Sequence, residues 1–315
     1  MTLRPGSRQF VRAPIAEGTA PRRPGRVPYP WSVVLYRLEH VPDLRSPALV
    51  VAFDGWVDAG TAATTAANQV AGGGEVIATF DADALFDYRA RRPSLEIEDG
   101  RPSQITWPEL VVRRTEIGGR DVLVLAGPEP DYRWHELCEA AVDLARRLGI
   151  VEWISVGAIP GAVPHTRPVP VMGTASKPEL LRGGVEPGPE GILRVPAAAL
   201  SVLDMAISAA GIPAVGYFAQ VPHYVTGPAP AAAIELLRVL GHHLGAEIPL
   251  GPLPEEARQI RARLDLAMSA DESTRAHVAR LEARVDEERQ PTGDDLIADI
   301  ERFLHDRGNE GSQRS

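Results

Sequence analysis

The 315-residue sequence predicts an α/β fold, in which a mostly parallel sheet is sandwiched by helices and followed by a C-terminal α-helical extension. Three observations predict this fold. Short apolar runs alternate with segments of helical periodicity through residues 31–250, which is typical of parallel strands joined by helices. The run 49–53 is apolar at every position, as expected for a central strand that is buried on both faces. After the Pro- and Gly-rich stretch 249–254, the pattern becomes acidic and helical.

Composition sets the expected domain boundaries. Residues 1–30 are rich in proline and arginine and too poor in apolar side chains to form a core, which predicts a disordered tail. The α/β core is expected over 31–250, the helical extension over 251–307 and a second disordered tail over 308–315. A core of this length can bury a substantial apolar interior.

The apolar runs and helical stripes predict the elements in order. A first strand is expected from Val33, and further strands are expected at 49–53, 75–80, 105–117, 121–126, 151–156 and 213–219. Helices are expected at 62–70, 134–148, 197–210, 230–244, 255–268 and 271–289, with another that opens at Thr292. The first helix carries alanines at three- and four-residue spacing, a stripe that permits close packing on a sheet. Residues 81–100 and 157–196 are expected to be loops.

Charge and cysteine content exclude several classes of protein. A net charge of −9 argues against a general nucleic-acid-binding protein. The single cysteine, Cys138, excludes an intramolecular disulfide and a cysteine-based zinc site. No apolar run approaches the roughly 20 residues of a membrane span, and the N-terminal residues lack the apolar core of a signal peptide. We therefore expect a cytoplasmic protein without nucleic-acid or membrane partners.

The loop after the central strand is the first candidate site. Ligands of open α/β sheets lie at the carboxyl ends of the strands, where Phe53, Asp54, Gly55, Trp56 and Asp58 are expected. The carboxylate of Asp58 is expected to cap the alanine-rich helix that follows. Two interpretations of Asp54 remain open. It forms an acid/base pair with Asp58 or binds a cation or a ribose hydroxyl, or it only marks the end of the strand. Hard cations need several oxygen ligands, and without a defined set of them we expect no metal.

A second candidate site is the polar cluster of Asp87, Tyr88, Arg89, Arg91 and Arg92. Arginine binds phosphate and carboxylate groups through paired hydrogen bonds, and it also stacks on aromatic rings. The cluster therefore predicts a site for an anion or for the acidic surface of a partner. The alternative is a solvated loop whose arginines are held by its own aspartates, and the sequence leaves both open.

The long Gly- and Pro-rich loop 157–196 contains His165 and Arg167. An imidazole after a strand end makes His165 the best single candidate for a general base. No serine or cysteine stands in a nucleophile-elbow pattern. The sequence has no P-loop, and the glycines 72–74 precede a strand rather than a helix, so they do not form a dinucleotide fingerprint. We therefore expect no cofactor.

Several stretches are similar to those of a known family. They are AFDGWVDAG (52–60), DYRARRP (87–93), GAIPG and PHTR (within 157–167) and VGYFAQVPHY (215–224). Together they resemble the proteasome assembly chaperone 2 family over about residues 32–250, and the helical extension resembles that of its longer bacterial members. The resemblance implies a fold like that of purine nucleoside phosphorylases, a chaperone-like or scaffolding role, self-association and no established catalysis. Members that engage proteasome rings can carry a hydrophobic–Tyr–any tail, whereas this chain ends in GSQRS.

The residues and the resemblance together predict a non-enzymatic interaction protein that forms a homo-oligomer and assists the assembly of a proteasome-like complex. Proteasome subunits are its expected protein partners. The expected contact residues are those of the 53–58 and 87–92 loops with His165 and Arg167, and the C-terminal helices are a further candidate surface.

The alternative is a phosphorylase- or hydrolase-like enzyme that binds a nucleoside or nucleotide at the strand ends. There Asp54 holds a hydroxyl or a base, His165 acts in acid/base chemistry, and an arginine from 89, 91 or 92 binds phosphate. Convergence of these groups on one concavity favours the enzyme, and their separation favours the interaction protein.

Overall fold

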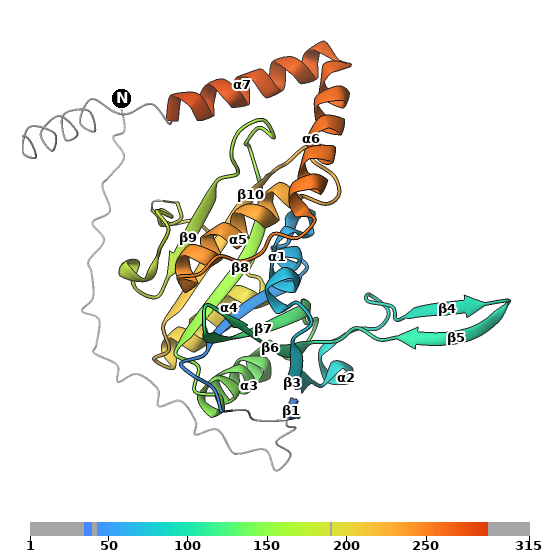
Figure 1. Ribbon diagram of the computed structural model, residues 1–315, viewed down its shortest axis with the longest axis vertical. Helices are drawn as coiled ribbons and strands as arrows, with labels where there is room; N and C mark the ends of the chain where they lie inside the picture. The colour runs from blue at the N-terminus through green and yellow to red at the C-terminus, as the bar shows by residue number, and fades with distance from the viewer. Residues whose placement is uncertain (1–34, 40–42, 190, 289–315) are drawn as a thin grey trace, which may run out of the picture. The chain divides into compact units, whose positions relative to one another are not determined.

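A computed structural model describes residues 35–39, 43–189 and 191–288 of the protein. The disordered tails expected at 1–30 and 308–315, the start of a strand at Val33 and the helix expected from Thr292 lie outside these residues. Within these residues, strands and helices follow one another along the chain, and the last two elements are helices (Figure 1). This confirms an α/β fold with helices at its C-terminal end.

In the described part of the chain, eight strands form one mixed sheet in the order β1-β3-β6-β7-β2-β8-β10-β9. The strands are β1 Tyr36–Leu38, β2 Ala48–Asp54, β3 Glu75–Phe80, β6 Val111–Ile117, β7 Arg120–Pro128, β8 Glu152–Gly161, β9 Val171–Ala175 and β10 Ala214–Pro222. The neighbours β7, β2, β8 and β10 run parallel, and the pairs on both flanks are antiparallel. The parallel pairing that the sequence predicts is therefore limited to the four central strands. Strands joined by a tight turn, such as β6 and β7, must pair antiparallel.

Strand β2 is buried on both faces, as predicted. Its odd-numbered side chains, from Leu49 to Phe53, belong to one apolar core with helices α3 and α4. Its even-numbered side chains, from Ala48 to Ala52, belong to a second core with helices α1 and α5. The helices are α1 Ala62–Ala71, α3 Trp134–Arg147, α4 Ala199–Ala209 and α5 Pro230–Leu244. Each face of the sheet is thus covered by a pair of helices, and the carboxyl end of β2 lies between the two helical layers.

The alanine stripe of α1 packs on the sheet as predicted. Ala62, Ala63, Ala66 and Ala67 have no exposed surface, and they share the second core with the small side chains of β2. Small side chains on both surfaces let the helix lie close to the sheet.

Two regions depart from the expected elements. The expected loop 81–100 contains a short helix, α2 (Ala82–Leu85), and the strand β4 (Ser94–Glu98), which pairs with β5 (Arg101–Thr106). The single strand expected at 105–117 is wrong, since β5 ends before Pro108, a residue that cannot donate a ladder hydrogen bond. Every residue of the strands β4 and β5 is exposed. The loop expected at 157–196 is shorter, because β8 and β9 occupy part of it.

Two helices, α6 (Leu253–Ser269) and α7 (Glu272–Glu288), follow α5, close to the predicted positions. Leu253 is buried in the core that α1 and α5 share, and α6 packs beside α5. On α7, the apolar side chains Val278, Leu281 and Val285 are buried at three- and four-residue spacing. These helices therefore pack through the amphipathic stripes that the sequence shows.

Candidate interaction surface

Two predicted residues of the loop after β2 have structural roles. Phe53 is 1% exposed and packs in the core, so its side chain is not available to a partner. Asp58 is also buried, and its carboxylate accepts hydrogen bonds of 2.7 and 3.3 Å from the N–H groups of Ala63 and Thr64. It thus caps the start of α1, as predicted, across the short 3-10 turn Ala59–Thr61. Burial raises the pKa of the Asp58 carboxyl, while the hydrogen bonds from Thr64 and Ala63 oppose that rise.

The other residues of this loop lie at the surface. Asp54 and Gly55 are exposed, and Trp56 exposes 63% of its surface. The backbone N–H of Trp56 donates a 3.2 Å hydrogen bond to the carboxylate of Glu129, which follows β7. A Cβ atom at Gly55 would lie 2.6 Å from that carboxylate, so the close approach of loop and glutamate requires glycine. The exposed tryptophan is therefore presented on a fixed backbone.

The 87–92 loop is also fixed by an acid that follows β7. The N–H of Asp87 donates to the Asp131 carboxylate at 2.8 Å, and Arg91 lies 3.7 Å from the same carboxylate. Asp87 in turn accepts a 2.9 Å hydrogen bond from the N–H of Arg89, which lowers the pKa of the Asp87 carboxyl. Arg89 and Arg92 are exposed and form no ion pair with the described residues. The acid that holds Arg91 is thus Asp131 and not an aspartate of the loop itself. The binding of an anion or a partner by the two exposed arginines stays a prediction.

Residues 128–132 join the two predicted loops into one surface. Glu129 accepts from Trp56 and also, at 2.7 Å, from the N–H of Ala199 at the start of α4. Two residues later, Asp131 holds the 87–92 loop. Sequence analysis missed both acids. The available signal was their position just after Pro128, which ends β7 and pairs with Asp54 at the end of β2.

Exposed aromatic side chains surround this junction. Trp56, Trp107 and Tyr132 each expose about half or more of their surface. The Tyr88 ring packs edge-on against Trp107 with centroids 4.9 Å apart, and its hydroxyl donates to Asp83 at 2.6 Å. We call this set the aromatic surface. It consists of the exposed residues Trp56, Arg89, Arg92, Trp107 and Tyr132 and the half-buried Tyr88. Tryptophan, tyrosine and arginine are the residues most enriched among those that dominate protein–protein binding energies.

The remaining predicted residues, His165 and Arg167, anchor the C-terminal helices. The buried imidazole of His165 lies 2.8 Å from the Tyr224 hydroxyl and 3.1 Å from the Asp265 carboxylate of α6. The Arg167 guanidinium donates two hydrogen bonds, of 2.7 and 2.6 Å, to Asp286 of α7. These bonds raise the pKa of Arg167 above its ordinary value. Both side chains are thus engaged in packing the helices rather than free for chemistry.

The groups of the alternative enzyme do not converge. Asp54 lines a polar hollow beside α1 and β6, whereas His165 lines a separate hollow beneath α6. The arginines at 89, 91 and 92 line neither. In residues 35–39, 43–189 and 191–288, no three His, Cys, Asp or Glu side chains gather as a metal site requires. No helix in this part of the chain is long and apolar enough to cross a bilayer.

Comparison with known proteins identifies the family. The family model described as PAC2 family matches residues 52–268, more than half of the chain. The chain belongs to the PAC2 family. The match contains the four sequence stretches that resemble this family, together with the aromatic surface and the loop that holds α6 and α7. No curated protein matches the chain.

Solved structures of similar proteins include other members of the PAC2 family. A PAC2 family protein from Streptomyces avermitilis is 39% identical, with a TM-score of 0.65 over 74% of this chain and 99% of that one. A Corynebacterium glutamicum protein of unknown function is 30% identical, with a TM-score of 0.76 over 82% of this chain and 98% of that one. A Mycobacterium tuberculosis protein described as a proteasome-assembly chaperone homologue is 33% identical, with a TM-score of 0.67 over 73% and 99%.

Proposed function

We propose that this PAC2 family protein is a non-enzymatic assembly factor that binds protein partners and assists a proteasome-like complex. The observation that carries the proposal is the aromatic surface, where exposed tryptophan, tyrosine and arginine side chains stand on loops fixed by Glu129 and Asp131. Because these loops are already ordered by hydrogen bonds, a partner that binds them loses little conformational entropy. The Mycobacterium tuberculosis relative supports the choice of a proteasome-like client.

The test is co-purification of partners with the tagged full-length chain from its own cells, identified by mass spectrometry. Trp56→Ala and Arg89→Glu remove an exposed ring and reverse an exposed charge. Each is expected to lower recovery of proteasome subunits at least about tenfold, as loss of a central interface residue does. The matched controls are Leu266→Ala and Arg263→Glu, which alter exposed residues of α6 outside the aromatic surface. Equal recovery with all four variants, or no recovery with the unchanged chain, contradicts the proposal.

We also propose that the protein self-associates through the β4–β5 hairpin. An isolated two-stranded hairpin is at best marginally stable in water, and this one exposes the apolar side chains Leu95, Ile97 and Ile105. Leu95 and Ile105 lie directly opposite each other in the register, so they share one face. A second copy of the chain that covers this face would remove its apolar surface from water.

Light scattering of the full-length chain tests this self-association. The double variant Leu95→Lys/Ile105→Lys is expected to dissociate the oligomer, since it places charge on the apolar face. Gln104→Lys is the matched control, because Gln104 pairs with Glu96 in the neighbouring register position. A monomeric unchanged chain, or an oligomer that persists in the double variant, contradicts the proposal.

The alternative, a nucleoside-binding enzyme on a fold like that of purine nucleoside phosphorylases, has less support. It requires Asp54, His165 and an arginine of the 87–92 loop to meet at one substrate. They line different hollows or none, and His165 is hydrogen-bonded on both ring nitrogens. A general base needs a free ring nitrogen within reach of its proton, which this arrangement does not offer.

A further inference from the structure

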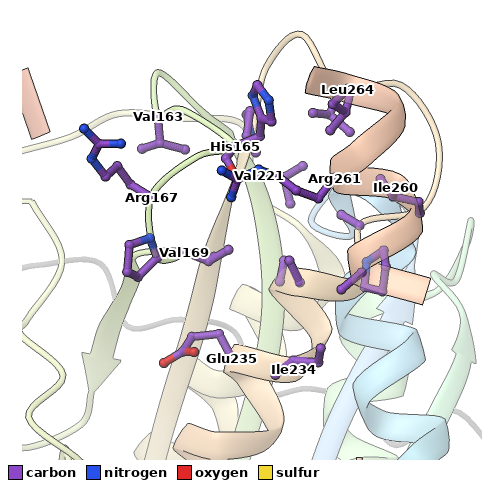
Figure 2. Close-up of a pocket in the computed structure, with 18 of the residues that line it drawn as sticks. Val163, His165, Arg167, Val169, Val221, Ile234, Glu235, Ile260, Arg261 and Leu264 are labelled. Carbon is purple, nitrogen blue, oxygen red and sulfur yellow. The ribbon is translucent and has the colours of Figure 1, made fainter. Parts of the chain in front are cut away.

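The aromatic surface does not include a hollow of about 510 Å³ that lies beneath α6. Its walls come from the 163–169 loop, the carboxyl end of β10, the first turns of α5 and the facing side of α6. Figure 2 shows Ile260, Arg261 and Leu264 of α6 on one side, Ile234 and Glu235 of α5 below, and Val221 of β10 between them. We call this space the α6 hollow. Its volume lies within the range of pockets that hold small molecules.

The walls of the α6 hollow are mainly apolar. The apolar stripe of α6, at Ala257, Ile260 and Leu264, is only half buried, although these positions face the body of the protein. Protein interiors are normally filled to the density of organic crystals, so an apolar stripe over an unfilled space loses contacts that packed side chains would make. An apolar body within the hollow would restore those contacts.

The charged side chains at the α6 hollow are mostly cationic. Arg167, Arg238, Arg258 and Arg261 line it, with Glu235 as the acid among the lining residues. This balance stands out in a chain whose net charge is −9. The Arg167 guanidinium is bound to α7, and Figure 2 shows its side chain pointing away from α6. The other three arginines are the cations that a ligand could meet.

Each of those three guanidinium groups pairs with an acid on its own helix. Arg238 and Arg258 pair with acids one turn away on their own helices, Glu235 and Glu255, and both arginines are well exposed. Such exposed pairs within a helix contribute little, so an anion with two oxygens can replace a carboxylate partner at small cost. Arg261 likewise pairs with an acid on its own helix, Asp265 at 3.3 Å, and it also donates to the backbone carbonyl of His165 at 3.1 Å, which positions its guanidinium beside the loop.

We propose that the α6 hollow binds a small amphipathic anion, with an apolar body against Val221, Ile234 and Leu264 and a carboxylate or phosphate group at Arg238, Arg258 and Arg261. A nucleoside fits less well, because the lining residues contain no Phe, Tyr or Trp on which a base could stack. This site is separate from the aromatic surface, so the protein would bind a small molecule and a partner protein at different places.

Calorimetric titration of the full-length chain at low ionic strength tests the proposal with octanoate, octyl phosphate and octanol. At least one of the two anions is expected to bind at least about tenfold more tightly than octanol. The anion that binds more tightly shows whether the site prefers a carboxylate or a phosphate. The double variant Arg238→Gln/Arg258→Gln is expected to weaken anion binding about tenfold and to leave octanol unchanged. Arg263→Gln is the matched control, since Arg263 is an exposed arginine of α6 outside the lining.

A second variant tests the apolar walls. Leu264→Asn is expected to weaken all three probes, because it removes apolar contact without altering the rim. Binding of octanol as tight as that of the anions, no binding of either anion, or full binding by the double variant overturns the proposal. These readouts use purified protein and small molecules alone, so they do not depend on the proposed role in assembly.

Discussion

The guanidinium of Arg167 and the carboxylate of Asp286 form a bidentate pair that joins the loop after β8 to α7, with hydrogen bonds of 2.7 and 2.6 Å. Glu282, one turn earlier, lies 3.3 Å from the same guanidinium. The pair therefore connects residues that are more than a hundred positions apart in the chain. It assigns to Arg167 a role in holding the C-terminal helices.

Removal of this pair is expected to loosen α7 without unfolding the core. In Arg167→Gln, the backbone amides of α7 should exchange hydrogen several-fold faster, because α7 loses a bidentate charge-assisted pair. It keeps its buried stripe and the hydrogen bonds of Glu282 with Thr166 and of Arg284 with the Ala162 carbonyl. Hydrogen exchange followed by mass spectrometry measures this effect. Arg280→Gln, at an exposed position of α7, should leave the rates unchanged. Unchanged exchange in the Arg167 variant would show that the stripe and the remaining hydrogen bonds hold the helix without this pair.

Gly55→Ala is expected to disturb both the Trp56 loop and the start of α4. The new Cβ would lie 2.6 Å from the Glu129 carboxylate, which must move away from the N–H groups of Trp56 and Ala199. Loss of a helix-capping acceptor reduces the free energy of unfolding by roughly 1–2 kcal/mol, measurable by urea denaturation. Gly73→Ala is the matched control, since a Cβ there meets no atom within 4 Å. Equal stability of the two variants would contradict the role of Glu129.

The carboxyl of Asp204 on α4 predicts a dependence of stability on pH. It accepts hydrogen bonds from the Trp153 indole, at 2.9 Å, and from the Ser155 hydroxyl, and burial raises the pKa of this carboxyl to about 7, well above the ordinary value of an aspartate. The folded protein therefore favours the protonated form. Its contribution to stability is complete below about pH 4 and is lost as the pH rises through 7, at up to about 1.4 kcal/mol per pH unit.

Asp204→Asn removes this titration while keeping an oxygen that accepts from both partners. The variant should gain stability relative to the unchanged chain between pH 5 and pH 8, measured by urea denaturation at each pH. Asp99→Asn, at an exposed hairpin turn, should show a constant difference. A constant difference for Asp204→Asn would show that the carboxyl is charged in the folded protein.

A chain that ends at Leu250 is expected to fold without α6 and α7. The eight-stranded sheet and the four helices that cover it are complete before this residue. The truncated chain loses the buried side chain of Leu253 and the contacts of His165 and Arg167, so its melting temperature should fall while the transition stays cooperative. Calorimetry decides the question. Loss of the cooperative transition would show that the helices are part of the core.

The sequence was sufficient to predict the centre of the fold. The apolar run of β2 and the alanines of α1 predict burial on both faces, and both are found. The β4–β5 hairpin was not predicted. Leu95 and Ile97 do alternate with polar residues, but they are only two apolar positions among charged ones, and both are exposed. Exposed strands lack the burial that makes a strand visible in a sequence.

Most of the candidate site depends on contacts that local patterns do not encode. Asp54, Trp56 and the 87–92 loop were predicted, but their connection through Glu129 and Asp131 requires β7 to lie beside β2, which is a property of strand order. His165 was interpreted as a base because the acid that it faces, Asp265, lies a hundred residues later. The helix that carries Asp265 was predicted, whereas its docking position was not.

The alanine stripe of α1 limits which side chains can replace these alanines in homologues. Ala62, Ala63, Ala66 and Ala67 have no exposed surface, so any larger side chain must push the helix away from the sheet. That displacement would be passed directly to the turn at Asp58 and to the exposed ring of Trp56 just before it. Homologues that keep the same presentation of this tryptophan should therefore be confined to glycine, alanine or serine at these four positions, even though none of them reaches the surface.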